Sequence, residues 1–341
     1  MAASDATDGS RRADARPPAM LLAAGLGTRL RPLSHVRAKP AVPVNGRPLA
    51  RRILTWLADH GIREAIVNLH HRPQTVAAVI GDGSDLGLRI RYSWEQPVLG
   101  SAGGPRHALP LLTDGHAGPF VIVNADTLTT VDVDGLLARH AVAGAAVTMA
   151  LIPNPAPMKY GGVRVSADGY VTGFTRAGTP GESFHFVGVQ AADARAFAAL
   201  DDGVPAESVN TLYPRLLAAE PTAVAAFVSD ASFRDIGTPR DYLETSLALA
   251  EVEGADLVST RGVEIDATAT VERTVVWDDV SIGRHARLVE CIVGDGVHVP
   301  DGAVFERCAI VRGDGLVPAA DERVEGPLLI RAIPAGSSDD H

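Results

Sequence analysis

The chain has 341 residues, 46% of them apolar and 21% charged, which is the composition of an ordinary globular protein able to bury a core. Its length exceeds the roughly 250–300 residues at which a single core stops growing, so we expect two domains. A net charge of −10 disfavours a general nucleic-acid binder, and no apolar run approaches the roughly 20 residues of a membrane-spanning helix.

The chain ends and the cysteines bear on where the protein works. No apolar stretch follows the Arg11-Arg12 pair, so no secretory signal is expected and residues 1–18 are predicted to be a disordered leader. The only cysteines, Cys291 and Cys308, lack the spacing of a disulfide framework or a zinc site. These features favour a reduced, cytoplasmic setting.

Strands and helices alternate along the first half of the chain. An apolar run over 19–24 breaks at Gly25 and predicts a buried strand that ends in a loop. Further strands are predicted at 64–69, 88–94 and 119–126, with helices at 48–61, 72–83 and 104–112. This alternation predicts right-handed βαβ units and a mostly parallel sheet. Ligands of such sheets lie beyond the carboxyl ends of the strands, so the Gly25 loop and Asp126 are expected to face one crevice. A less regular stretch, 145–242, is expected to extend the sheet and to cover the acceptor.

One segment of this acidic protein is electropositive. No acidic residue lies between Asp14 and Asp59, although eight arginines and lysines do. Only two of the 31 basic residues are lysines, Lys39 and Lys159. One interpretation is that these two lysines are present by chance. The other is that a site needs the compact charge of an ammonium, which a planar guanidinium does not replace, and it makes Lys39 a candidate phosphate ligand.

The periodicity changes after residue 259. Apolar residues then recur at intervals of five or six, at Val271, Val276, Ile282, Leu288, Val293, Val299, Val304 and Ile310. Such a hexapeptide pattern predicts a parallel β-helix of about three coils, with a plain antiparallel β region as the alternative. The Pro-, Gly- and Ser-containing residues after 315 are expected to form a loose tail.

The loop after the first strand suits a phosphate, because glycines there present backbone N–H groups. A dinucleotide fingerprint is excluded, since no third glycine or downstream acid follows Gly25 and Gly27, and a Walker loop is absent. The stretch "LAAGLGTRLRPLS", followed by "AKP" and "PV", instead resembles the signature of the sugar-1-phosphate nucleotidyltransferases. Ala24, Ser34 and Ala38 are mild departures from that pattern.

The resemblance continues along the chain. Motifs similar to those of the family stand at "LGSAGG" (99–104), "VNAD" (123–126), "KYGGV" (159–163), "FVGVQ" (186–190) and "FRDIGTPRDYL" (233–243). The resemblance implies an α/β fold with a Rossmann-like, GT-A-like nucleotidyltransferase domain over 19–250. A short left-handed parallel β-helix over 259–315 and a tail over 316–341 would follow it.

The implied reaction is attack by the phosphate of a sugar 1-phosphate on the α-phosphorus of an NTP, with release of pyrophosphate. Charge neutralisation then matters more than a protein nucleophile. By resemblance, Arg29 and Lys39 are catalytic, and Asp126 and Asp235 bind Mg²⁺. The implied nucleotide-binding residues are Leu22, Ala23, Ala24, Gly25, Gly27, Thr28, Glu95, Gly100 and Ser101. The implied sugar-phosphate residues are Lys159, Tyr160, Gly161, Arg176 and Gly188.

The acceptor side departs from the family. The stretch "FTRAG" (174–178) lacks the Glu and Lys of the usual F-x-E-K-P motif, so either Arg176 or Lys159 is expected to replace that lysine. This departure resembles the guanylyl- and uridylyltransferase branches, and GTP with mannose 1-phosphate is the favoured pair. N-acetylmuramate, heptose or glucose 1-phosphate remain alternatives.

Two other function classes compete with this one. A silent nucleotide-sugar-binding regulatory subunit is disfavoured by the intact charged set. An acyltransferase that uses His285 or His298 is disfavoured because three coils are few for an acyl-CoA site. The coils are expected to serve a homo-oligomer contact instead.

Overall fold

The computed structural model describes residues 16–335, so most of the predicted leader, 1–15, lies outside the described residues, as does 336–341. The described chain forms two compact units. Unit 1 contains the chain up to Gly25 together with Ile53–His71 and Ile80–Phe233. Unit 2 contains Leu26–Arg52, Arg72–Val79 and the chain from Arg234 onward. The helices α2 (Leu49–Asp59) and α3 (Pro73–Ile80) each have residues in both units.

Unit 1 is built on one sheet with strand order β10-β9-β11-β6-β1-β4-β5, to which β8 and β12 are added beside β11. Its strands are β1 (Ala19–Leu22), β4 (Glu64–Leu69), β5 (Arg89–Trp94), β6 (Phe120–Asn124), β8 (Val147–Pro153), β9 (Gly162–Val165), β10 (Val171–Thr175), β11 (Phe184–Ala192) and β12 (Val224–Val228). The strands from β6 through β1 and β4 to β5 are parallel, as predicted. β11 runs antiparallel to β6, β8 and β9, so the sheet as a whole is mixed.

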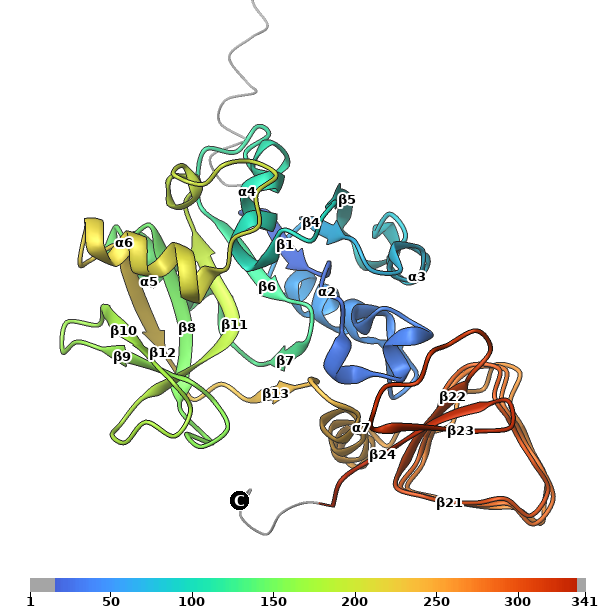
Figure 1. Ribbon diagram of the computed structural model, residues 1–341. Helices are drawn as coiled ribbons and strands as arrows, with labels where there is room; N and C mark the ends of the chain where they lie inside the picture. Colours follow the sequence, from blue (N-terminus) through green and yellow to red (C-terminus); the bar gives the residue numbers. More distant parts are fainter. Residues whose placement is uncertain (1–15, 336–341) are drawn as a thin grey trace, which may run out of the picture. The chain divides into compact units, whose positions relative to one another are not determined.

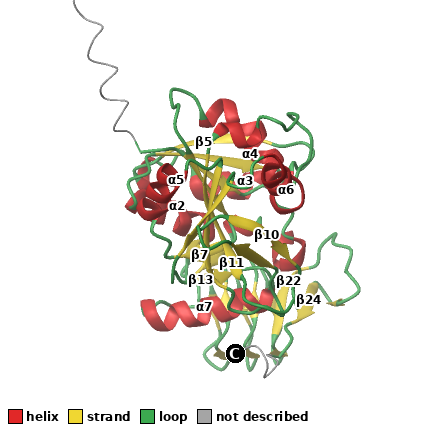
Figure 2. Cartoon of the chain, turned by 90° about the vertical axis from the view of Figure 1, so that its left-hand side faces the viewer, coloured by secondary structure: helices red, strands yellow, loops and turns green. Residues whose placement is uncertain are grey.

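Helices cover both faces of this sheet (Figure 2). On one face, α4 (Gly100–Leu112) and α6 (Tyr213–Ala219) pack into a core that includes Met149 of β8. On the other face, His140 of α5 (Val133–Ala143) lies 2.9 Å from the hydroxyl of Thr148, the neighbouring residue of the same strand. Successive side chains of a strand point to opposite faces, so α5 lies across the sheet from α4 and α6.

Unit 2 contains the signature from Leu26 onward, the helix α7 (Pro239–Glu253) and a parallel β-helix. The β-helix has three faces of three parallel strands each, and partners on successive coils are 17 residues apart. Its strands are β14 (Glu264–Ile265), β15 (Thr270–Glu272), β16 (Val275–Val276), β17 (Ser281–Ile282), β18 (Arg287–Val289), β19 (Ile292–Val293), β20 (His298–Val299), β21 (Val304–Glu306) and β22 (Cys308–Arg312). Figure 1 shows the coils stacked as nearly superimposed triangles. The parallel pairing confirms the β-helix and excludes the antiparallel alternative.

The end of the chain differs from the expected loose tail. Strands β23 (Glu322–Glu325) and β24 (Leu328–Ala332) form a hairpin, and β24 pairs antiparallel with β22 of the last coil. The expectation followed the Pro and Gly content, but Leu328, Leu329 and Ile330 are buried against the coil. An apolar strand that covers an open sheet edge in this way gains both hydrogen bonds and buried surface.

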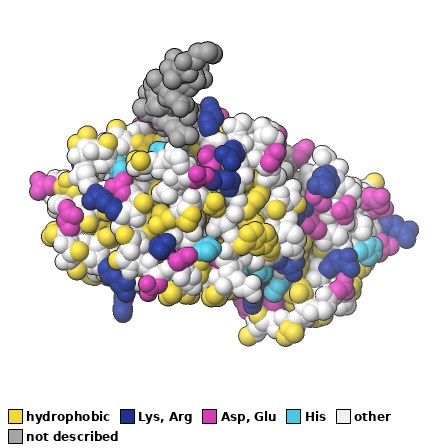
Figure 3. Space-filling view, turned by 90° about the horizontal axis from the view of Figure 1, so that it is seen from above, with side chains coloured by type: hydrophobic (Ala, Val, Ile, Leu, Met, Phe, Trp, Pro, Cys, Tyr) yellow, Lys and Arg dark blue, Asp and Glu magenta, His cyan; other side chains and the backbone are white. Residues whose placement is uncertain are grey.

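The remaining short strands are β2 (Pro43–Val44), β3 (Arg47–Pro48), β7 (Thr127–Thr129) and β13 (Phe233–Asp235). Within the described part of the chain, no helix has the length and apolar character that crossing a membrane requires. On the face seen in Figure 3, basic and acidic side chains are interspersed.

Candidate functional site

The predicted site residues are divided between the two units, and each group is described by itself. In unit 1, the loop after β1 is held by a buried hydrogen-bonded chain. The Ala23 N–H donates to Asn68 Oδ1 at 2.6 Å, and Asn68 Nδ2 donates to Glu95 Oε1 at 2.6 Å. The other carboxylate oxygen of Glu95 accepts from the Leu99 N–H at 2.8 Å. Glu95, predicted to bind nucleotide, is therefore 4% exposed, with both oxygens committed to the protein.

This series of hydrogen bonds includes Asn68, a residue that the family motifs did not indicate. Asn68 is the last but one residue of β4, and a polar residue near the carboxyl end of a buried strand was the available signal. Gly104 leaves room for it, since a Cβ there would lie 2.5 Å from Glu95 Oε1 and 2.9 Å from Asn68 Nδ2. By contrast, a Cβ on Gly25 would meet nothing within 4 Å, so open space remains beside the turn.

The start of α4 is also engaged with the protein. Ser101 Oγ donates to Glu207 Oε2 at 2.7 Å and accepts from the Ser208 N–H at 2.9 Å. Gly100 has a φ of +78°, and a Cβ there would lie 2.6 Å from Glu207 Oε1. Gly100 and Ser101 thus fix this turn against 206–208.

Two of the predicted residues, Asp126 and Gly188, lie near the end of β6. Asp126 follows that strand, and its Oδ1 lies 3.3 Å from the hydroxyl of Thr127. Gly188 has a φ of +78°, and a Cβ there would lie 2.9 Å from the side-chain nitrogen of Asn124, two residues before Asp126. The pairing of β11 with β8 shifts register between Phe186 and Gln190. β11 pairs antiparallel with β6, and the absence of a Cβ at Gly188 lets the predicted sugar strand pack against Asn124 of the "VNAD" motif.

The two candidate replacements for the missing lysine lie on adjoining loops of unit 1. The Gly178 N–H donates to the Pro157 carbonyl at 2.8 Å, and a Cβ on Gly161 would lie 2.9 Å from the Thr175 carbonyl. These contacts place the loop of Lys159 beside the loop of Arg176, and both side chains belong to exposed residues. The Lys159 ammonium lies 5.2 Å from the centre of the Tyr160 ring.

An aromatic cluster supports the first of these loops. The Tyr160 ring lies 4.4 Å from the His185 ring and 5.8 Å from the Phe233 ring. Burial lowers the pKa of His185 to about 4, so this imidazole is neutral near pH 7. His185 therefore packs as an uncharged ring and does not add a cation to the loop.

In unit 2, the second glycine of the signature contacts the predicted catalytic lysine. Gly27 has a φ of +62°, and a Cβ there would lie 3.3 Å from Ser34 Cβ and 3.5 Å from Lys39 Cβ. Lys39 is only 9% exposed and begins the short 3-10 turn Lys39–Ala41. Thr28 begins a similar turn, Thr28–Leu30. A larger residue at 27 would strain the backbone and push against the stem of Lys39.

Arg29 and Asp235 lie on either side of another glycine of unit 2. The position that a Cβ on Gly237 would take is 2.9 Å from Asp235 Oδ2, 3.1 Å from Arg29 Nη1 and 3.2 Å from Asp241 Oδ2. Asp241 belongs to the capping box of α7, where its carboxylate accepts from the Thr238 N–H at 2.9 Å. The structure thus brings one predicted catalytic cation and one predicted metal ligand together at the start of a helix.

The electropositive segment is less free than its sequence suggests. Arg37 pairs with Asp278 and Asp295, and Arg52 pairs with Glu253 at 2.6 Å. The acids lie more than 200 residues away along the chain, so the absence of nearby acids did not reveal them. Part of this positive charge is consequently structural.

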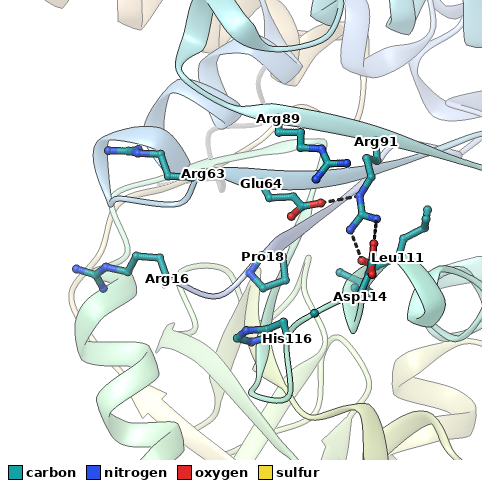
Figure 4. A pocket seen from close by; sticks show the side chains of 11 residues that line it. Arg16, Pro18, Arg63, Glu64, Arg89, Arg91, Leu111, Asp114 and His116 are labelled. Atoms are coloured by element: carbon teal, nitrogen blue, oxygen red, sulfur yellow. Dashed lines mark hydrogen bonds and ion pairs between the residues drawn. The ribbon is translucent and has the colours of Figure 1, made fainter. Parts of the chain in front are cut away.

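A separate cavity of about 240 Å³ lies in unit 1 at the amino ends of its parallel strands (Figure 4). Its residues include Pro18 before β1, Glu64 at the start of β4 and Arg89 at the start of β5. Arg91 Nη1 pairs with Asp114 at 2.9 Å, and its Nε lies 2.5 Å from Glu64 Oε1 without hydrogen-bond geometry. The predicted nucleotide loops of unit 1 follow the opposite, carboxyl ends of these strands, so this cavity is not part of the candidate site.

Comparison with known proteins agrees with these motifs. A family model described as nucleotidyl transferase matches residues 18–252, and one described as GlmU-like, C-terminal hexapeptide matches 247–306. The chain is 30% identical over 300 residues to a mannose-1-phosphate guanylyltransferase of Mycobacterium tuberculosis, covering 85% of this chain and 83% of that one. It is 31% identical over 226 residues to a D-glycero-alpha-D-manno-heptose 1-phosphate guanylyltransferase of Aneurinibacillus thermoaerophilus, covering 66% and 94%. The crystal structure of HddC from Yersinia pseudotuberculosis matches the fold with a TM-score of 0.60 at 21% identity, over 69% of this chain and 100% of that one.

Proposed function

The chain belongs to the nucleotidyl transferase family, and we propose that it transfers a nucleotidyl group from an NTP to a sugar 1-phosphate, giving an NDP-sugar and pyrophosphate. The favoured substrates are GTP and mannose 1-phosphate, since several relatives carry the name mannose-1-phosphate guanylyltransferase. The observation that carries the proposal is the signature loop itself, in which Lys39 packs on Gly27, and Arg29 and Lys39 each lie in a short 3-10 turn.

In the proposed reaction, a phosphate oxygen of the sugar 1-phosphate attacks the α-phosphorus of the NTP. The bond from that phosphorus to the bridging oxygen of the β-phosphate breaks, and pyrophosphate leaves with the electron pair. The nucleophile is already an anion, so no general base is needed. Arg29 and Lys39 would neutralise charge on the transferring phosphate, and the turn at Gly25 and Gly27 would hold the triphosphate.

Nucleotidyltransferases of this family generally use a divalent metal, and we propose Mg²⁺, with Asp126 and Asp235 as its ligands. No cluster of three or more His, Cys, Asp or Glu suited to a metal occurs among residues 16–335. Two carboxylates nevertheless fit Mg²⁺, which proteins hold by one or two carboxylates, with phosphate oxygens and water as the other ligands. When bound, the ion would supply positive charge that offsets the charge of the phosphates.

The test is pyrophosphate release, measured for the four NTPs against a panel of sugar 1-phosphates that includes mannose, heptose, glucose and N-acetylmuramate. We expect turnover with GTP and mannose 1-phosphate that Lys39→Ala lowers to a small but measurable residual rate and that Asp126→Ala abolishes. Binding of an NDP-sugar without turnover of any pair would support the regulatory-subunit alternative. Turnover that requires UTP would show that the nucleobase is uracil and not guanine.

The sugar side can be resolved in the same assay. Lys159→Ala and Arg176→Ala are matched variants, because both remove an exposed cation from adjoining loops. Whichever residue replaces the family lysine is expected to raise the KM for the sugar 1-phosphate about tenfold or more, the equivalent of one charge-assisted hydrogen bond, with the KM for NTP unchanged. If both variants changed the KM for the sugar 1-phosphate equally and only slightly, groups other than Lys159 and Arg176 would bind the sugar phosphate.

We further propose a reducing, cytoplasmic setting and a homo-oligomer. Cys291 and Cys308 are both free and buried, and burial raises the pKa of the Cys291 thiol to about 11, which disfavours its oxidation. Light scattering after size exclusion, at protein concentrations that span the assay range, tests the oligomer.

A further inference from the structure

The signature loop is anchored to the β-helix through Arg37, two residues before Lys39. Arg37 Nε donates to Asp295 Oδ2 at 2.7 Å, and its Nη2 donates to Asp278 Oδ2 at 2.7 Å and to Asp295 Oδ1 at 2.8 Å. The two aspartates stand 17 residues apart, on successive coils. One guanidinium thus bridges two coils, which is a geometry that the planar, forked arginine provides and lysine does not.

These contacts are mostly shielded from water. The exposed fractions of the Arg37, Asp278 and Asp295 side chains are 16%, 13% and 26%. The guanidinium carbon also lies 5.4 Å from the centre of the Trp277 ring, which is fully buried. Partly buried ion pairs are screened less by salt than exposed ion pairs. Together with the contact to the Trp277 ring, they leave the Arg37 guanidinium little freedom to move.

The loop is held on the other side of Lys39 as well. Trp277 Nε1 donates to the hydroxyl of Tyr242 at 2.9 Å, and that hydroxyl donates to the Pro43 carbonyl. The Ala38 N–H donates to Thr75 Oγ1 at 3.0 Å. The backbone is therefore fixed on both sides of the turn that carries the lysine, and Trp277 takes part on each side.

We propose that Arg37 is a positioning residue, through which the β-helix fixes the backbone that presents Lys39 to the phosphate. A lysine side chain is a flexible stem, so the position of its ammonium depends on where its backbone is held. The turn Lys39–Ala41 is a single 3-10 turn without a side-chain cap, and it cannot hold itself. The role of Arg37 rests on the proposed function, because that function assigns the phosphate to Lys39.

A positioning role and a purely structural role predict different kinetics. If Arg37 acts through Lys39, Arg37→Gln should lower kcat about tenfold or more, since small misplacements of a catalytic group are costly, with little change in the KM for NTP. In a Lys39→Ala background, the same substitution should lower kcat less than twofold, because there is no ammonium left to position. An equal loss in both backgrounds would overturn the proposal.

Two further variants separate this effect from misfolding. Asp295→Asn keeps the shape of the side chain but weakens its hold on Arg37, and it should reproduce the loss in kcat in part. Arg284→Gln removes a comparable arginine of the β-helix, which pairs with Asp301 at 3.2 Å but is 70% exposed, and it should leave kcat unchanged. A loss in kcat with Arg284→Gln as large as with Arg37→Gln would show a general effect on the β-helix.

Amide hydrogen exchange tests the same idea without activity. Peptides covering 36–44 should exchange at least tenfold faster in Arg37→Gln than in the wild type and Arg284→Gln, when each protein is measured at the same interval below its own melting temperature. Unchanged exchange would overturn the positioning role even if the enzyme is active. If no NTP and sugar pair turns over, the proposed function fails, while faster exchange still shows that Arg37 holds the loop.

Discussion

Replacing Glu95 with Gln tests whether the buried chain of hydrogen bonds fixes the loop after β1. Every donor in that chain has a set direction: the Ala23 N–H faces the Asn68 oxygen, and both the Asn68 amide and the Leu99 N–H face Glu95. Only a group that accepts at both oxygens satisfies all of them, and a carboxylate is such a group. In Glu95→Gln, whichever way the amide is turned, one NH₂ must face another donor.

The magnitude follows from burial. Glu95 is 4% exposed and Asn68 3%, so water does not replace the lost partner. A buried donor left without an acceptor costs about 1–3 kcal/mol, and a hydrogen bond to a charged group contributes about 1.5–3 kcal/mol. We expect Glu95→Gln to lower the free energy of unfolding by about 2–4 kcal/mol. For a domain of 150–250 residues this corresponds to a fall in melting temperature of roughly 4–16 °C.

Differential scanning calorimetry and urea unfolding provide the measurement, with Glu220→Gln as the control, since Glu220 is exposed at the end of α6. The KM for NTP should rise as well, because Asn68 would no longer hold Ala23 in place. A melting temperature within 1 °C of the wild type would refute the reasoning, since it would mean that the two donors find other acceptors.

Three further predictions concern unit 2. Tyr242→Phe removes the acceptor of the buried Trp277 N–H and the donor to the partly buried Pro43 carbonyl, and it should lower the free energy of unfolding by about 1–3 kcal/mol in urea titrations; no change would show that water or another group replaces the hydroxyl. Arg331 of the C-terminal hairpin donates to the Arg29 and Arg31 carbonyls at 3.2 and 2.8 Å, so Arg331→Leu should lower kcat severalfold, whereas Arg323→Leu on the neighbouring strand should not. Burial raises the pKa of Asp278, but hydrogen bonds from Ser259 and Arg37 outweigh it and hold that pKa below its ordinary value of 3.8. A carboxylate whose pKa is lowered in the folded state stabilises the protein at pH values above its unfolded pKa, and this stability is lost as the pH falls through the folded pKa. The difference in unfolding free energy between wild type and Arg37→Gln should therefore be constant from pH 8 to 6 and shrink below about pH 4. A difference that grows in acid would contradict the ion-pair assignment.

The C-terminal hairpin illustrates where prediction from composition fails. The tail contains Pro, Gly and Ser, and these residues suggested a loose end. The run Leu328–Ile330 is short and is interrupted on both sides, so its periodicity is weak. Its structure depends on the free edge of β22, to which it is added, and that edge exists only once the coils are stacked.

The sequence by itself determined the elements and the chemistry of the loops. Apolar periodicity placed the strands of unit 1 and the coils of unit 2 because side-chain spacing is a local property of each element. The glycines and cations of the signature are likewise contiguous, so the motif stands out along the chain. Only the tertiary structure decided which charged side chains form contacts that stabilise the fold. Arg37 meets its carboxylates across 241 and 258 residues, and Asn68 meets Glu95 across 27. The free energy of those contacts depends on distance and burial in space, which spacing along the chain does not encode.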